Sequence, residues 1–287
     1  MNEMRTRFLT RMINSEVEDF LERRDVIFVP IGAVETHGGL PLDCEAVLSE
    51  AFALRMAEAA DGLVLPNLCY FYAGGTAVGR GTVQMSISEG TAYLKAIALS
   101  LLNQGFKRQI YLSFHGPASL TASAMVRDFF DRTKVPIIYI DLIRVAASKK
   151  VQFYDESVFF DLITGGYSIL GKIEEVPLNV PESNSVCYSG PSGESAELAG
   201  ILRNVRSPGG AVGFYYNNPS DHMGTPLIRS AEERAACAQR GERLICDMVD
   251  AMDIPGMAAA MKQLEDFNRE RILPRYGTWL PHDYTVN

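Results

Sequence analysis

Four short apolar runs, rich in β-branched residues, divide the first half of the chain, and helix-like segments separate them. Their apolar residues are continuous rather than alternating, so each strand is expected to be covered on both faces. That is typical of parallel strands held between two helical layers. The runs are residues 26–32, 62–65, 109–114 and 136–143. The pattern predicts an α/β fold, a three-layer α/β/α sandwich with a mostly parallel central sheet.

The segments around these strands favour amphipathic helices. We expect Ser88 to cap the second helix, because a serine hydroxyl at that position accepts a backbone hydrogen bond. A strand is expected near residues 210–214, and residues 165–193, rich in Gly, Pro, Ser and Asn, read as a long loop that could cover a functional site. The predicted helices are residues 45–60, 88–104, about 118–132, and 231–252.

The chain of 287 residues is long enough to bury one full hydrophobic core. It contains no internal repeat, and no stretch has the composition of a linker. We therefore expect one domain over residues 1–287, with its core at 20–250 and a C-terminal extension at 251–287.

The charge balance limits the partners. With 27 Lys and Arg against 35 Asp and Glu, the net charge is −8, whereas nucleic acids and anionic membranes require clustered basic residues. The N-terminal residues predict an amphipathic helix rather than a signal peptide, and no apolar run approaches the ~20 residues that span a bilayer. The five cysteines are scattered and odd in number. We expect a cytoplasmic protein that binds a small molecule and neither nucleic acid nor membrane.

The chain has only four histidines, and two of them follow predicted strands directly. His37 lies in Glu-Thr-His-Gly-Gly after the first strand, two residues beyond Glu35, and His115 lies in Ser-Phe-His-Gly-Pro after the third. Ligands of open α/β sheets bind at the carboxyl ends of strands. Mixed carboxylate and imidazole ligands suit zinc, manganese or iron better than magnesium. A polar loop that merely faces water is the alternative.

Three further acids stand next to predicted helix starts. Asp43 and Glu45 precede and open the helix at 45–60, and Glu194 follows a Gly-Pro-Ser-Gly stretch. Acids at these places commonly cap a helix or complement its dipole. The functional alternative is that one of the first two reaches back to the Glu-x-His loop and bridges metal ions.

Taken together, these stretches resemble the creatininase (creatinine amidohydrolase) family. The family motif Glu-x-His-Gly-x-His-Leu-Pro-Leu-x-Thr-Asp is similar to Glu-Thr-His-Gly-Gly-Leu-Pro-Leu-Asp-Cys-Glu at residues 35–45. Residues 80–86, 113–117 and 193–196 resemble three later motifs in the same order. The similarity covers roughly residues 20–250.

The resemblance implies a metal-dependent hydrolase with two divalent ions, zinc or manganese with iron as a third option, in a homo-oligomer. A water activated by both ions would attack the carbonyl of a small, cyclic amide. Carried over by position, the implied ligands of one ion are Glu35, Glu45 and His115, and those of the other are His37, Glu45 and Glu194, with Glu45 bridging.

Two departures from the family pattern matter. The first motif is one residue shorter and its bridging Asp becomes Glu45, whose longer side chain would compensate, with Asp43 as the alternative bridge. The family histidine before Gly-x-x-Glu aligns with Ser189, which cannot replace an imidazole as a proton donor near pH 7. Tyr188 and His222 are therefore candidate catalytic residues.

The substrate pocket is expected to differ from that of creatininase itself, with Arg80 and Gly116 as candidate substrate-binding residues. Hydrolysis of a cyclic amide C–N bond is the leading interpretation. Hydrolytic C–C ring opening of a cyclic ketone such as an inosose is the second, because an enolate leaving group needs less protonation than an amine. A non-catalytic metal-binding homologue is the third.

Overall fold

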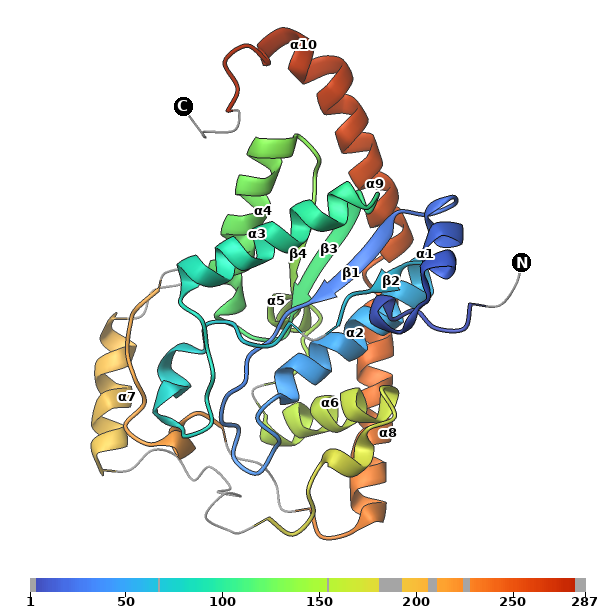
Figure 1. The fold of residues 1–287 in the computed structure, drawn as a ribbon. Helices are drawn as coiled ribbons and strands as arrows, with labels where there is room; N and C mark the ends of the chain where they lie inside the picture. The colour runs from blue at the N-terminus through green and yellow to red at the C-terminus, as the bar shows by residue number, and fades with distance from the viewer. Residues whose placement is uncertain are drawn as a thin grey trace.

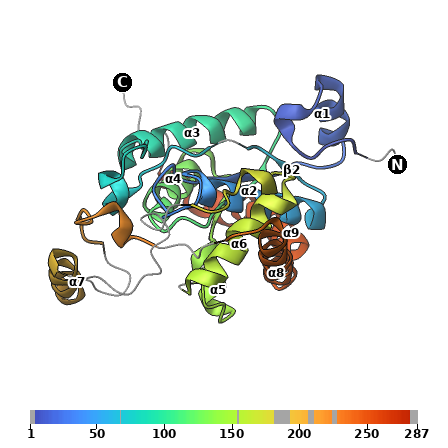
Figure 2. The ribbon, with the colours of Figure 1, turned by 90° about the horizontal axis from the view of Figure 1, so that it is seen from below.

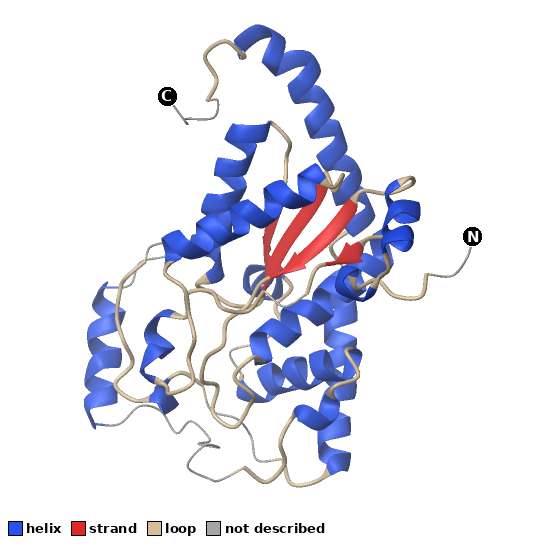
Figure 3. Cartoon of the chain, viewed as in Figure 1, coloured by secondary structure: helices blue, strands red, loops and turns tan. Residues whose placement is uncertain are grey.

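A parallel sheet of four strands lies at the centre of the molecule, with helices on both faces, as predicted (Figures 1 and 3). The computed structural model describes residues 4–66, 68–153, 155–180, 193–205, 211–223 and 228–281. The strands occur in the spatial order β2-β1-β3-β4, and every neighbouring pair is parallel. Their bounds are β1 (Val26–Pro30), β2 (Leu63–Val64), β3 (Arg108–Ser113) and β4 (Ile138–Asp141).

Successive side chains of each strand enter two different cores, because neighbouring residues of a strand point to opposite faces. In β1, Val26 and Phe28 belong to one buried cluster, whereas Ile27 and Val29 belong to the other. Since both faces are apolar, the strands read as continuous hydrophobic runs, which explains why the sequence revealed them.

The two clusters correspond to two helical layers, seen edge-on in Figure 2. One layer contains α2 (Cys44–Ala60), α5 (Leu142–Ser148), α6 (Glu156–Ile169), α8 (Ala231–Asp250) and α9 (Ile254–Phe267). The other contains α1 (Asn14–Leu21), α3 (Ile87–Asn103) and α4 (Ala118–Thr133). The remaining elements are η1 (Leu9–Arg11), η2 (Gly74–Val78), η3 (Ile173–Glu175), α7 (Gly193–Val205), η4 (Pro219–Asp221), η5 (Asn268–Ile272) and α10 (Leu273–Tyr276).

The glycines at the start of the predicted loop 165–193 belong instead to helix α6, so that part of the prediction is wrong. A Cβ at Gly165 would lie 2.4 Å from the backbone carbon of Gly241 on α8. The backbones of α6 and α8 therefore touch, and the glycines serve close helix packing rather than a turn. Residues 181–192 of the predicted loop lie outside the described part of the chain.

Two smaller expectations also change. The cap of α3 is Ser86 and not Ser88: the Ser86 hydroxyl accepts a hydrogen bond from the Glu89 backbone N–H, and the Glu89 carboxylate accepts one from the Ser86 backbone N–H. This reciprocal pair is a capping box, which requires three-residue spacing. Residues 211–214 form no strand, and residue 210 lies outside the described residues.

The C-terminal helix α9 packs on the core before the chain leaves it. Ile254 and Met261 are buried in the same cluster as α2, and Arg108 at the start of β3 pairs with Glu265 at 2.8 Å. Beyond Phe267 the helical arm projects away from the sheet (Figure 1). Among the described residues, no helix is long and apolar enough to cross a membrane.

Candidate active site

Four of the five predicted metal ligands converge where strands β1 and β3 end. Glu35 and His37 follow β1, His115 follows β3, and Glu45 stands in the first turn of α2. Because β1 and β3 are neighbours in the sheet, the loops that follow them emerge side by side. All four side chains are buried. A polar cluster of this kind inside a protein needs internal partners.

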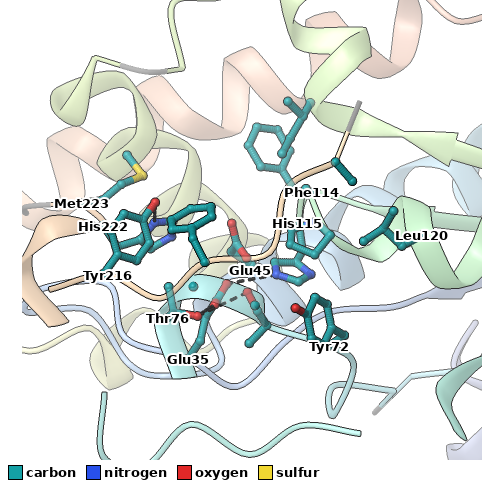
Figure 4. Close-up of a pocket in the computed structure, with 18 of the residues that line it drawn as sticks. Glu35, Glu45, Tyr72, Thr76, Phe114, His115, Leu120, Tyr216, His222 and Met223 are labelled. Carbon is teal, nitrogen blue, oxygen red and sulfur yellow. Dashed lines mark hydrogen bonds and ion pairs between the residues drawn. The ribbon is translucent and has the colours of Figure 1, made fainter. Parts of the chain in front are cut away.

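Each carboxylate of the cluster faces an imidazole. Figure 4 shows one of these pairs, Glu35 with His115. The Nε2 atom of His115 lies 3.1 Å from Oε1 of Glu35, and Nε2 of His37 lies 3.5 Å from Oε1 of Glu45. The hydroxyl of Thr76, on turn η2, donates a hydrogen bond to Oε2 of Glu35. Thr76 thus binds one oxygen of the Glu35 carboxylate, and the other oxygen faces His115.

A third imidazole reaches the cluster from a distant segment. His222, which directly follows η4, places Nε2 at 3.2 Å from Nε2 of His37. Its Nδ1 atom lies 3.3 Å from the hydroxyl of Tyr216. The sequence suggested His222 as a candidate catalytic residue, and nothing in its Asn-Asn-Pro-Ser-Asp context indicated this contact.

Two overlapping groups of side chains have the spacing of a metal site. Within each group, one candidate ligand atom per residue lies within 4.8 Å of the others. Glu35 is the member common to both groups, although the resemblance pointed to Glu45 as the bridging residue. The groups are Glu35, Glu45 and His115, and Glu35, His37 and His222.

Several buried polar atoms of the cluster have no hydrogen-bond partner. They are Nδ1 of His37, Oε2 of Glu45 and Nδ1 of His115. Leaving such atoms unsatisfied costs on the order of 1–3 kcal/mol each. A divalent cation accepts lone pairs from these donors, and carboxylates with imidazoles are the donor set that zinc and manganese take. The residues present therefore fit a metal.

The electrostatics of the cluster agree with this fit. Burial raises the pKa of the Glu35 carboxyl. The hydrogen bond and charge of His115 and the charge of His37 outweigh this effect, so the pKa of Glu35 lies below its usual range. Burial lowers the pKa of His37, but Cys44 and Glu45 raise it above its ordinary value, and Glu45 and Glu35 do the same for His115. The buried carboxylates thus attract positive charge, which a metal ion would supply in place of protons.

A cavity of about 430 Å³ opens onto the cluster, and Glu35, Glu45 and His115 are among the residues that line it (Figure 4). Most of its walls are apolar or aromatic, and no lysine or arginine lines it in the described part of the chain. The predicted substrate-binding residue Gly116 is among the lining residues, whereas Arg80 is exposed and is not. The apolar walls are Phe114, Leu120, Ile143, Phe153, Phe159, Val212, Phe214 and Met223.

Glu194 and Asp43, two other predicted site residues, are not part of this cluster. Glu194 is exposed in the first turn of α7 and belongs to neither ligand group. Asp43 stands at the start of α2, but its carboxylate accepts a hydrogen bond from the hydroxyl of Tyr167 rather than capping the helix. Tyr188 and Ser189 lie outside the described residues.

Thr76 and Tyr216 are site residues that sequence reasoning missed. Both act through another side chain, Thr76 through Glu35 and Tyr216 through His222. Neither lies in a motif with metal-ligand spacing. The available signal for Thr76 was its Gly-Gly-Thr turn, because paired glycines allow the backbone to approach a site closely.

A family model described as "Creatininase: Creatinine amidohydrolase" matches residues 10–161. A 3-dehydro-scyllo-inosose hydrolase of Thermotoga maritima is 27% identical over 137 residues, which are 47% of this chain and 44% of that protein. The match therefore spans less than half the length of this relative.

Solved structures share the fold over nearly the whole chain. A candidate creatinine amidohydrolase of Bacteroides fragilis NCTC 9343 is 21% identical, with a TM-score of 0.64 over 92% of this chain and 98% of its own. A manganese form of creatininase is 18% identical, with a TM-score of 0.59 over 90% and 98%. A mutant creatininase of Zn–Zn type is 16% identical, with a TM-score of 0.56 over 90% and 98%.

Proposed function

The chain belongs to the creatininase family, a family of hydrolases, and we propose that it hydrolyses a small cyclic carbonyl compound with the help of divalent metal ions. One observation carries the proposal: a buried cluster of two carboxylates and two imidazoles has unpartnered polar atoms, and Glu35, Glu45 and His115 of this cluster line a largely apolar cavity. We propose Glu35, Glu45 and His115 as the ligands of one ion, with His37 beside them at a second.

Bound divalent ions would supply Lewis-acid polarisation of a carbonyl and a water that ionises near neutral pH. The chain's own residues prepare the place for this chemistry. Thr76 fixes the orientation of the Glu35 carboxylate, and the buried position of the cluster strengthens each charge–charge interaction. The aromatic walls would contact a ring bound above the cluster.

Opening of a cyclic amide at its C–N bond is the first candidate reaction. It follows from the family model, whose description is an amidohydrolase. The lining residues support a neutral substrate, because the described walls offer no lysine or arginine to pair with an anionic group. A compact neutral lactam suits a cavity of about 430 Å³.

Hydrolytic C–C cleavage of a cyclic ketone is the second candidate. The relative from Thermotoga maritima is named as a hydrolase of an inosose, which is a cyclic ketone, and it is 27% identical over the aligned part. The loss of the family histidine at Ser189 supports this reaction as well, because an enolate leaving group requires less protonation than an amine.

The test combines elemental analysis of the purified chain with a parallel hydrolysis screen of lactams, formamides and cyclic ketones. Bound zinc or manganese together with turnover of lactams would support the first candidate. Turnover of ketones alone would select the second. Metal content below one ion per chain would overturn the metal-dependent mechanism and favour a non-catalytic homologue.

We also propose a homo-oligomer, as the family resemblance implies. The C-terminal arm of the chain exposes Phe267, Tyr276 and Trp279, and 72% of the Trp279 surface is accessible. Large exposed apolar side chains of this kind favour an interface. Light scattering coupled to gel filtration measures the mass directly, and a mass of one chain at micromolar concentration would contradict this proposal.

A further inference from the structure

The segment 211–223 forms one wall of the cavity and ends at the metal cluster. Val212, Phe214 and Tyr216 line the cavity along this segment, and His222 and Met223 line it at the end. Tyr216, His222 and Met223 are labelled in Figure 4. The wall that contacts a substrate and the side chain that reaches His37 thus belong to the same stretch of chain.

The segment is fastened to the turn that supports Glu35. The backbone N–H of Tyr216 donates a hydrogen bond to the carbonyl oxygen of Gly75 at 3.0 Å. A Cβ at Gly75 would lie 3.0 Å from the ring of Phe214 and 3.2 Å from that of Tyr216, so the glycine permits this close approach. Thr76, which orients Glu35, is the next residue of the same turn.

His222 is oriented as metal-ligating histidines are. Such a histidine donates one ring N–H to a nearby oxygen, which leaves the other nitrogen with its lone pair toward the ion. In His222, Nδ1 lies 3.3 Å from the Tyr216 hydroxyl, and Nε2 lies 3.2 Å from Nε2 of His37. One candidate ligand atom from each of Glu35, His37 and His222 lies within 4.8 Å of the other two.

We infer that His222, rather than Glu194, completes the ligand set of the second ion together with Glu35 and His37. Binding of this ion would then hold segment 211–223 in position as the cavity wall. The inference rests on the proposed function only in assuming that the cluster binds metal. It assigns His222 a ligand role in place of proton transfer.

Metal stoichiometry tests the assignment. The full chain is loaded with Zn²⁺ or Mn²⁺, dialysed against metal-free buffer and analysed by inductively coupled plasma mass spectrometry. We expect two ions in the wild type and in Glu194→Ala, and one ion in His222→Ala. Two ions in His222→Ala, one in Glu194→Ala, or no ion in His222→Ala would each overturn the inference. Circular dichroism of each metal-free variant verifies that it folds.

Hydrogen–deuterium exchange supplies a second readout that does not depend on turnover. We expect added metal to slow exchange in residues 211–223 of the wild type and of Glu194→Ala, but not of His222→Ala. Equal protection in His222→Ala would overturn the inference. Two ions bound through His222 without turnover of any compound would sink the proposed hydrolase and leave this assignment intact. Unchanged stoichiometry with a lost rate in His222→Ala would instead indicate proton transfer.

Discussion

The hydroxyl of Tyr167 on α6 donates a hydrogen bond to Oδ1 of Asp43 at 2.7 Å, just ahead of the first turn of α2. Tyr167 is fully buried, so this bond has no competition from solvent at the tyrosine. Through this bond Asp43 links the start of α2 to α6. Glu45, two residues further on, directs Oε1 at Nε2 of His37 over 3.5 Å. The two neighbouring acids therefore have different tasks.

Glu45→Ala is expected to lose the ion held by Glu35, Glu45 and His115, whereas Asp43→Ala is expected to keep both ions. Removing Asp43 instead leaves the buried Tyr167 hydroxyl without its acceptor, which costs about 1–3 kcal/mol of unfolding free energy. Metal analysis and urea denaturation measure the two effects. Tyr167→Phe is the control, since it removes the same bond from the other side. Metal loss in Asp43→Ala with retention in Glu45→Ala would reverse the assignment.

Thr76→Val is expected to weaken metal binding about 10–100-fold, because the partners of ligating side chains fix their orientation. Valine has the shape of threonine without the hydroxyl that donates to Oε2 of Glu35. Thr76→Ser keeps the hydroxyl and is expected to bind metal as the wild type does. Titration in metal buffers gives the dissociation constants. Equal affinity in the valine and serine variants would show that the hydrogen bond does not support the site.

The sheet and most of the cluster could be predicted from the sequence because the residues that indicate them stand close together in the chain. Each strand is a continuous apolar run, since it is covered on both faces, and each histidine that follows a core strand stands out against it. His37 and His115 converge because β1 and β3 are neighbours, and parallel strands bring the residues that follow them to the same edge. The same local signal contained Glu35 and Glu45.

The contribution of His222 could not be predicted in this way. It meets His37 across 185 residues of sequence, and Thr76 meets Glu35 across 41, both from loops without periodicity. Such contacts depend on how loops fold back over the sheet. The loop prediction at Gly165 failed for a related reason. In the sequence, a glycine that permits two helices to touch cannot be distinguished from a glycine in a loop.

Gly241→Ala is expected to destabilise the fold strongly. A Cβ at Gly241 would lie 1.7 Å from the backbone carbonyl oxygen of Asp161, so α8 would have to move away from α6. Overpacking of this kind costs about 1–3 kcal/mol or more. Gly200→Ala on α7 is the control, because its Cβ would meet only the Arg203 side chain at 3.8 Å. Helix propensity predicts a gain of up to about 1 kcal/mol there.

Urea denaturation of both alanine variants distinguishes packing from propensity. The midpoint is expected to fall for Gly241→Ala and to stay or rise for Gly200→Ala. A Gly241→Ala chain as stable as the wild type would contradict the close contact of α6 and α8. Soluble expression of Gly241→Ala at reduced temperature keeps the comparison possible if the loss is large.

The stability that Asp61 provides is expected to disappear in acid. Asp61 ends α2 with φ at 50° and pairs with Arg7 at 3.3 Å and with Arg23. Burial raises its pKa, but the hydrogen bonds and charges of Arg23 and Arg7 outweigh this and hold the pKa below its ordinary value of 3.8. A carboxyl with a lowered folded pKa stabilises the fold above its unfolded pKa and loses this effect as pH falls through the folded pKa.

Asp61→Asn removes the charge while keeping a residue that tolerates the left-handed conformation. Because the side chain is 35% exposed, solvent screening limits the expected loss to about 1 kcal/mol at pH 7. The difference from the wild type is expected to shrink below about pH 4. Urea denaturation from pH 7 to pH 3 measures it, with Asp250→Asn, an exposed acid at the end of α8, as control. A difference that persists unchanged at pH 3 would show that the ion pairs do not stabilise the fold.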